Sequence, residues 1–201
     1  MKKLIICVLV TLGWTGYAAA SGDAAAGKDK TAVCAACHGA TGVSIAPNFP
    51  SLAGQGAGYL IKQMEDIKSG ERKVVEMTGM VENLSDQDIA DIAAFYASQD
   101  APLGIAKESS VKIGQRLYYG GDVEKGIPGC TACHSPTGQG NSLARFPALA
   151  GQQPDYIAKQ LRDFREGDRV NDGDTRIMRD IAEKLSNKQI DALSSYISGL
   201  R

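Results

Sequence analysis

The chain has 201 residues, with 22 lysines and arginines against 23 aspartates and glutamates, and a formal net charge of −1. This balance lacks the basic footprint of nucleic-acid-binding proteins, so we exclude nucleic acid as a partner. Lys2 and Lys3 belong to a segment that we expect to be removed. Without them the chain has 20 basic and 23 acidic side chains.

Residues 1–20 have the three parts of a cleaved secretory signal peptide. Lys2 and Lys3 give a positive start, residues 4–12 form an apolar run too short to span a bilayer, and the alanines at 18–20 form a cleavage site. An uncleaved membrane anchor is the alternative, but no long apolar run follows. We therefore expect a secreted chain that begins near residue 21, and we expect it to be soluble.

The elements that follow are mainly helical. Asp23 is a candidate N-cap for a helix that runs through an alanine-rich stretch toward Cys34. Apolar residues at helical spacing in residues 59–69 predict a second helix, which Gly70 ends.

The last helix of each half begins at a serine. Ser85 and Ser186 each precede apolar residues at helical spacing, and Ser186 opens a capping box with Gln189. A further helix is predicted over residues 109–119. Because no convincing strand or hairpin signal is present, the sequence predicts an all-α fold.

The chain repeats itself. Residues 49–55, Phe-Pro-Ser-Leu-Ala-Gly-Gln, return as residues 146–152, Phe-Pro-Ala-Leu-Ala-Gly-Gln. Two copies of one unit indicate tandem domains rather than a solenoid, which needs at least three. We expect an N-terminal domain over residues 21–99, a linker over 100–106 and a C-terminal domain over 107–201.

Two Cys-x-x-Cys-His motifs carry the chemistry, and such a motif is typical of a c-type haem attachment site. Two thiols at this spacing can each add to a vinyl group of one porphyrin, and the following histidine can bind its iron. The motifs contain both histidines of the chain and four of its five cysteines. The predicted residues are Cys34, Cys37 and His38 in the first motif, and Cys130, Cys133 and His134 in the second.

A Cys-x-x-Cys pair has two other common uses, a redox-active dithiol and a zinc site. A thioredoxin-like dithiol pair needs a strand before it, but an alanine-rich run precedes Cys34. One zinc ion shared between the motifs is disfavoured because they lie 96 positions apart, from 34 to 130, and each has its own histidine. The sequence therefore predicts two covalently attached haem c groups.

The second axial ligand of each iron is predicted from the repeat. No third histidine exists, and methionine is the next soft ligand. The second half has only Met178, which lies seven residues before the Leu-Ser pair that opens the last helix, and Met77 has the same position in the first half. We therefore predict Met77 and Met178 as ligands, and Met64 and Met80 as packing residues.

Two further pairs of residues recur in register, and each has two interpretations. Pro50 and Pro147 lie 12 and 13 residues after their histidines, and their carbonyls could accept a hydrogen bond from the imidazole, or they could simply be turn residues. Arg72 and Arg169 could pair with haem propionates, or they could be ordinary exposed arginines.

These motifs together resemble class I cytochrome c, and two such units in one exported chain resemble the dihaem cytochrome c4 group. The resemblance rests on both Cys-x-x-Cys-His motifs, on residues 49–55 and their copy, and on residues 76–80 and 171–174. It implies two all-helical haem domains related by a pseudo-twofold axis. It also implies electron carriage in the periplasm between a quinol-oxidising complex and a terminal oxidase or other cytochromes, in some members loosely at the membrane surface.

Electron transfer without catalysis is the function that this pattern favours, because His/Met ligation leaves no open position on the iron. A dihaem peroxidase needs an open site and usually a distal acid/base group, and a gas sensor needs a five-coordinate iron. A haem subunit dedicated to one dehydrogenase is a third alternative, which the sequence does not separate from a free carrier.

Overall fold

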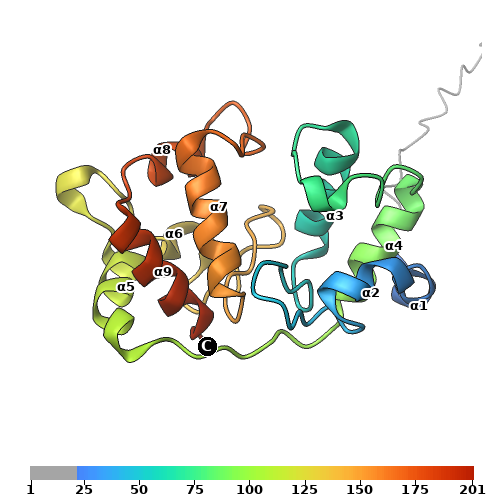
Figure 1. Cartoon of the computed structure of the whole chain (residues 1–201), viewed down its shortest axis with the longest axis horizontal. Coiled ribbons are helices and arrows are strands. Elements are labelled where there is room, and N and C mark those ends of the chain that lie inside the picture. Colours follow the sequence, from blue (N-terminus) through green and yellow to red (C-terminus); the bar gives the residue numbers. More distant parts are fainter. Residues whose placement is uncertain (1–21) are drawn as a thin grey trace, which may run out of the picture.

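The computed structural model describes residues 22–201, so the expected signal peptide lies outside the described part of the chain. Residues 22–201 form two helical units joined by an extended segment (Figure 1). Within this range there is no strand, only two isolated β-bridges. The predicted all-α fold is therefore confirmed. None of the helices in this range is long and apolar enough to cross a membrane.

Each unit begins with a helix that crosses its last helix, and the Cys-x-x-Cys-His motif lies between them in sequence. The first unit contains α1 (Ala24–Asp29), α2 (Ala32–His38), α3 (Ala57–Ser69), the 3-10 helix η1 (Val75–Met77) and α4 (Asp86–Ala97). The second contains α5 (Glu108–Gly120), the 3-10 helix η2 (Val123–Lys125), α6 (Thr131–His134), α7 (Pro154–Glu166), α8 (Ile177–Ala182) and α9 (Asn187–Ser198).

The start of the first unit differs from the prediction in one respect. Asp23 caps α1 as expected, because its carboxylate accepts two backbone N–H groups of the first turn. We expected a single helix that runs on toward Cys34. This expectation was wrong, because the chain turns between α1 and α2. At the turn, the hydroxyl of Thr31 donates to the carbonyl of Lys28 at 2.8 Å, which replaces the continuing helical bond.

The predicted starts of the last helix of each unit and the predicted end of α3 are confirmed. Ser85 and Asp88 form a reciprocal capping box at the start of α4, and Ser186 and Gln189 form the equivalent box at the start of α9. Gly70 follows α3 with a φ of 83°, a left-handed conformation that favours glycine.

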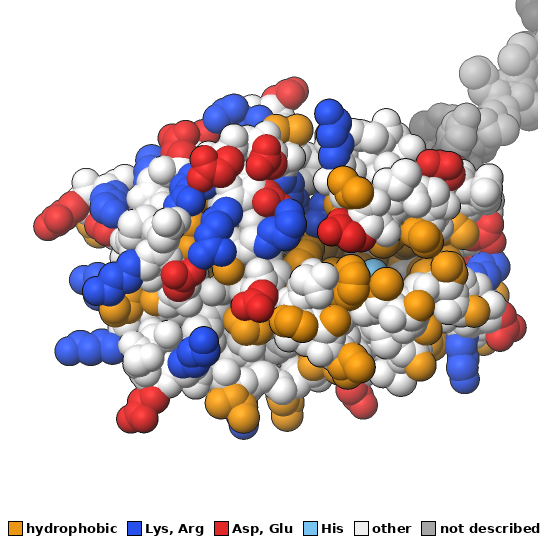
Figure 2. All heavy atoms as spheres, viewed as in Figure 1, with side chains coloured by type: hydrophobic (Ala, Val, Ile, Leu, Met, Phe, Trp, Pro, Cys, Tyr) orange, Lys and Arg blue, Asp and Glu red, His pale blue; other side chains and the backbone are white. Residues whose placement is uncertain are grey.

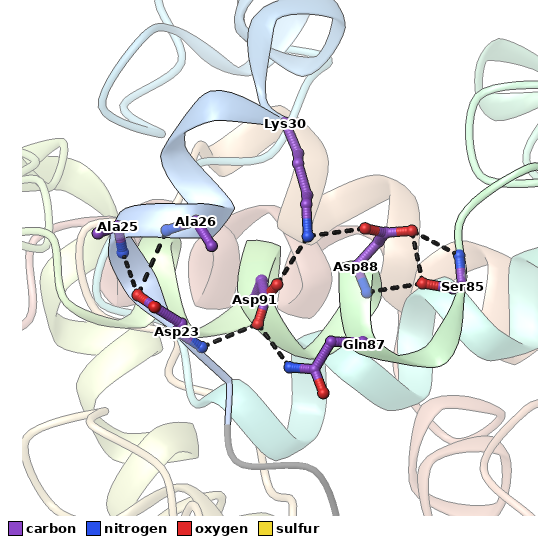
Figure 3. Close-up of polar contacts among 8 residues, drawn as sticks. All are labelled: Asp23, Ala25, Ala26, Lys30, Ser85, Gln87, Asp88 and Asp91. Atoms are coloured by element: carbon purple, nitrogen blue, oxygen red, sulfur yellow. Dashed lines mark hydrogen bonds and ion pairs between the residues drawn. The ribbon is translucent and has the colours of Figure 1, made fainter.

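Asp91 of α4 holds the N-terminal segment against the last helix of the first unit (Figure 3). Its carboxylate accepts from the backbone N–H of Asp23 at 2.9 Å, from Lys30 Nζ at 2.7 Å and from Gln87 Nε2 at 2.7 Å. Lys30 also pairs with Asp88 at 2.7 Å. These contacts, the Asp23 amide foremost, lower the pKa of Asp91 to about 2.

Glycines allow the first and last helices of each unit to cross closely. A Cβ atom at Gly27 of α1 would lie 2.0 Å from the carbonyl oxygen of Asp91 in α4. A Cβ atom at Gly114 of α5 would lie 2.3 Å from Cβ of Tyr196 in α9. Only glycine permits either crossing without movement of a helix.

Each unit has its own hydrophobic core, and among residues 22–201 no buried cluster spans both. In the first unit Leu60 of α3 packs with residues of α4, and Leu52 and Met64 lie against this cluster. The second core is larger and is built mainly from α5, α7 and α9. Its fully or nearly buried members are Leu117, Tyr118, Ile127, Ile157, Ala158, Leu185, Ile190, Leu193, Ile197 and Leu200.

Candidate haem attachment sites

The first Cys-x-x-Cys-His motif forms the end of α2. Cys34 and Cys37 carry free thiols and lie three residues apart in the helix, a spacing that brings two side chains to one side. His38 is the last residue of α2 and is only 7% exposed. Burial raises the pKa of the Cys34 thiol, so the free thiol is neutral at physiological pH.

The second motif repeats this arrangement at α6. Cys130 is the N-cap residue of α6, Cys133 lies within it, and His134 ends it and is 8% exposed. Both cysteines are free thiols, and burial raises the pKa of Cys130 to about 11. The predicted residues of each motif thus lie together on one short helix, and each motif belongs to a different unit.

Hydrogen bonds to proline carbonyls define the tautomer of both histidines. Nδ1 of His38 lies 2.9 Å from the carbonyl oxygen of Pro50, and Nδ1 of His134 lies 3.0 Å from that of Pro147. A carbonyl oxygen only accepts, so Nδ1 carries the proton and Nε2 keeps a free lone pair. Burial lowers the pKa of both imidazoles against the opposing effect of these bonds. Each imidazole is therefore neutral and able to bind a metal, and the prolines do more than form turns.

The loops that carry the two prolines have the same backbone hydrogen bonds. The carbonyl of Gly42 accepts the N–H groups of residues 52 and 53 at 2.7 and 3.1 Å. The carbonyl of Gly138 accepts those of residues 149 and 150 at 2.7 and 3.0 Å. The repeated sequence therefore folds into the same loop twice, and each loop fixes its proline against its histidine.

The methionines lie in different environments. Met77 ends η1 and Met178 is in the first turn of α8, and both side chains are half-buried. Met80 is 46% exposed. Met64 packs against the core of the first unit, which agrees with its predicted packing role. Met77 and Met178 as axial ligands remain a prediction.

Two glutamines cross the interface between the units in the same way. Gln152 Oε1 accepts the backbone N–H of Ser51 at 2.8 Å, and its Nε2 donates to the Ser51 carbonyl at 2.9 Å. Gln55 makes the same pair of bonds, at 2.8 and 2.9 Å, to the backbone of Ala148. Because Ser51 and Ala148 occupy equivalent positions in the repeat, these bonds are related by the pseudo-twofold symmetry of the two units.

Two arginines form a second reciprocal contact. Arg72 donates to Tyr156 Oη and Arg169 donates to Tyr59 Oη, both at 3.1 Å. The arginines are 9% and 8% exposed, so the interpretation as ordinary exposed side chains was wrong. Burial alone would raise the pKa of Tyr59, but the charges of Arg169 and Arg72 outweigh it and lower that pKa. Further acceptors of the guanidinium groups are Gln63, Gln160 and, for Arg169 alone, Asn171.

One buried residue breaks this symmetry. Asn171 is 3% exposed, and its Nδ2 donates to Gln63 Oε1 at 3.0 Å and to Asp66 Oδ2 at 2.6 Å across the interface. In the opposite direction, Lys62 Nζ of the first unit donates a hydrogen bond to the backbone carbonyl of Asn171 at 3.1 Å. The equivalent position in the first unit is Val74, which has no polar side chain.

Sequence reasoning missed the polar side chains that join the units. Gln55 and Gln152 were part of the repeated segment, but no role was assigned to them. A signal was available, because a glutamine ends an otherwise apolar and small-residue segment in both copies. Asn171 carried no such signal, since its counterpart is apolar.

The residues present fit a covalently held haem in each unit. Two free thiols and one neutral, buried imidazole are the groups that attachment and iron binding require. On the face seen in Figure 2, hydrophobic side chains gather around a partly visible histidine in the N-terminal unit, which suits the apolar faces of a porphyrin.

These features define a protein of two tandem c-type haem domains, and the chain belongs to the cytochrome c family. The model of that family, Cytochrome c, matches residues 24–100 and again residues 111–201. The particular group is the two-domain cytochrome c4 group. The chain is 62% identical over 200 residues to cytochrome c4 of Pseudomonas aeruginosa and 58% identical over 209 residues to that of Azotobacter vinelandii, and each alignment covers 100% of both chains.

A solved structure is similar as well. The crystal structure of reduced recombinant cytochrome c4 from Pseudomonas stutzeri superposes with a TM-score of 0.88 at 58% identity, and covers 90% of this chain and 100% of that one. The chain therefore holds two covalent haem c groups, one at each Cys-x-x-Cys-His motif, and it is a dihaem electron-transfer protein.

Proposed function

We propose that this protein carries electrons in the periplasm from a quinol-oxidising complex to a terminal oxidase. In this proposal His38 and Met77 bind the first iron, and His134 and Met178 bind the second. With both axial positions of each iron filled, no position remains for a substrate, so the protein exchanges electrons and catalyses no reaction of its own. Its signal-like residues 1–20 support export.

The observation that carries this proposal is the hydrogen bond from each buried histidine to a proline carbonyl. In this bond Nδ1 of His38 and of His134 donates, at 2.9 and 3.0 Å, so the lone pair of Nε2 is free to bind an iron. Such a bond fixes the orientation of the ring and raises its basicity. A methionine opposite the histidine raises the reduction potential, as a carrier late in a respiratory chain requires.

The ligand assignment is tested by absorption spectroscopy of the holoprotein. Met77→Ala is expected to remove the iron–sulfur charge-transfer band of one haem, and Met178→Ala that of the other. Met80→Leu is the matched control, because Met80 lies three residues from Met77 and is 46% exposed. Loss of the band in Met80→Leu, with the band kept in Met77→Ala, would overturn the assignment.

A second experiment tests whether both axial positions of each iron are filled, and it also tests the enzyme and sensor alternatives. The reduced native protein is expected not to bind CO, and the protein in either redox state is expected not to turn over peroxide at a catalytic rate. Binding of CO without denaturation indicates an open iron and supports a sensor, whereas peroxide turnover supports a peroxidase.

One relative of this chain suggests a different electron donor. The chain is 39% identical over 171 residues to a protein of Stutzerimonas stutzeri named thiosulfate dehydrogenase electron acceptor, and covers 78% of its length. We infer from this likeness that a thiosulfate-oxidising dehydrogenase is an alternative donor. Stopped-flow reduction of the oxidised protein by each purified donor separates the two, because the physiological donor reduces it faster at physiological salt.

A further inference from the structure

One peptide group connects the first histidine to the other unit. The carbonyl of Pro50 accepts the hydrogen bond of His38 Nδ1 at 2.9 Å, and the N–H of the same peptide group, that of Ser51, donates to Gln152 Oε1 at 2.8 Å. Gln152 also holds the Ser51 carbonyl through Nε2, and its side chain is buried, so the amide orientation is fixed from both ends.

The second histidine has the same connection in the opposite direction. The carbonyl of Pro147 accepts from His134 Nδ1 at 3.0 Å, and the N–H of that peptide group, that of Ala148, donates to Gln55 Oε1 at 2.8 Å. Each imidazole is therefore linked, through a single peptide group, to a glutamine of the other unit.

We propose that Gln152 and Gln55 are positioning residues that tune the haem of the opposite unit, Gln152 acting on the first haem through His38 and Gln55 on the second through His134. The proposal rests on the proposed histidine ligation. If so, the docking of the two units contributes to the electronic environment of each haem. A change of the glutamine in one unit then alters the reduction potential of the haem in the other unit.

The direction of the effect follows from hydrogen-bond polarisation. A peptide group whose N–H donates becomes a better acceptor at its carbonyl, and each bond in such a chain strengthens its neighbour by about 10–30%. A stronger Nδ1–H···O bond gives the imidazole more anionic character, which favours the ferric over the ferrous ion. Removing the glutamine amide is therefore expected to weaken the bond at Nδ1 and to raise the reduction potential of the haem in the opposite unit.

The two histidines of the chain make the hydrogen bonds directly observable. In holoprotein labelled with ¹⁵N-histidine, each ferrous haem contributes one Nδ1–H resonance. The two are assigned through the neighbouring aromatic rings, since Phe49 lies 6.3 Å from the His38 ring and Phe146 lies 6.4 Å from the His134 ring, centroid to centroid.

Gln152→Met is expected to move the His38 Nδ1–H resonance upfield and to raise the ratio of reduced to oxidised first-domain haem several-fold at a fixed potential. Gln55→Met is expected to do the same to His134 and the second haem. The populations are followed at each poised potential by the same labelled resonances. A shift confined to the haem on the substituted residue's own side would overturn the proposal.

Gln153 supplies the matched control. It follows Gln152, and its Nε2 also crosses the interface, but it donates to the carbonyl of Ser44 at 2.6 Å and makes no bond to the proline peptide group. Gln153→Met therefore weakens docking and is expected to leave both Nδ1–H resonances in place. If Gln152→Met and Gln153→Met change both haems equally, the glutamines only hold the units together and the proposal is wrong.

A second variant keeps the test decisive if Gln152→Met separates the units. Gln152→Glu keeps an acceptor for the Ser51 N–H and replaces the amide donor with a second carboxylate oxygen, so the His38 resonance is expected to move downfield or stay. An upfield shift equal to that of the methionine variant contradicts the proposal. Failure of histidine ligation itself is distinguishable, because the native ferrous protein would then show no histidine ring resonances shifted by the ring current of a haem.

Discussion

Arg72 and Tyr156 lie on opposite sides of the interface between the units and meet at 3.1 Å, and Arg169 and Tyr59 repeat the contact at the same distance. Among residues 22–201 neither arginine makes an ion pair. The side-chain hydrogen-bond acceptors of both buried guanidinium groups are thus neutral oxygens. Haem propionates are the anions that we propose to complete this network, as one interpretation of the sequence suggested.

Tyr156→Phe is expected to lower the free energy of unfolding by about 1.5–3 kcal/mol, because a hydrogen bond to a charged, buried group is lost without a change of shape. Tyr59→Phe is expected to have a similar effect, since the contacts are related by the pseudo-twofold axis. Urea unfolding of the holoprotein measures both. The double variant tests coupling, because residues of one network are not expected to add.

Tyr119→Phe provides the control for these two variants. Tyr119 is 48% exposed, and its hydroxyl donates to the carbonyl of Pro136 within the second unit. We expect a change of no more than about 0.5 kcal/mol for such a surface substitution. An equal loss in all three variants means that the interface tyrosines contribute nothing specific to docking.

Asn171→Val tests the asymmetry of the interface, since it gives the second unit the residue that Val74 provides in the first. Asp66 and Gln63 would each lose a buried donor, so we expect destabilisation by about 1–3 kcal/mol in urea unfolding. The exposed Asn83 serves as control, and Asn83→Val is expected to change stability little. A stable Asn171→Val protein would mean that this bond set is dispensable.

The helix crossing in the second unit is tested by two substitutions in α5. Gly114→Ala places a Cβ 2.3 Å from Cβ of Tyr196 and is expected to cost about 1–3 kcal/mol through overpacking. Gly120→Ala is the matched control, because nothing lies within 4 Å of its Cβ position. Thermal unfolding of the holoprotein compares them, and equal melting temperatures for both variants contradict the close crossing.

Local signals in the sequence were sufficient for the helices and the attachment motifs. Ser85, Ser186 and Gly70 act through hydrogen bonds or backbone angles within a few residues, so their effect can be read from neighbouring letters. The two Cys-x-x-Cys-His motifs are equally local. The missed break between α1 and α2 has a local cause too, but a threonine is compatible with a helix interior and gives no clear stop.

The interface could not be predicted in the same way, because its bonds join residues 84 to 110 positions apart. The repeat indicated that Gln55 and Gln152 are equivalent, yet equivalence does not say that each reaches the other unit. The repeat showed that Arg72 and Arg169 are in register, but it did not show that they are buried. Burial depends on how the two units dock, and no periodicity within one unit encodes that.

The pH dependence of stability offers a test of the contact between α1 and α4. The side chain of Asp91 is 4% exposed, and its pKa of about 2 in the folded protein lies below the ordinary value of 3.8. A carboxylate with a lowered folded pKa contributes stability that is fully present above the unfolded pKa and is lost as the pH falls through the folded pKa. We therefore expect this contribution to decline between about pH 4 and pH 2.

Asp91→Asn is expected to be less stable than the native protein at pH 7 and to show a flatter loss of stability between pH 4 and pH 2. Some slope will remain, because Lys30 also holds the pKa of Asp88 below its usual range. Denaturant unfolding of the holoprotein, followed by far-ultraviolet circular dichroism at each pH, measures the difference. Asp100→Asn, at an exposed carboxylate between α4 and α5, is the control and should follow the native curve. If Asp91→Asn also follows that curve, the carboxylate does not anchor the N-terminal helix through its charge.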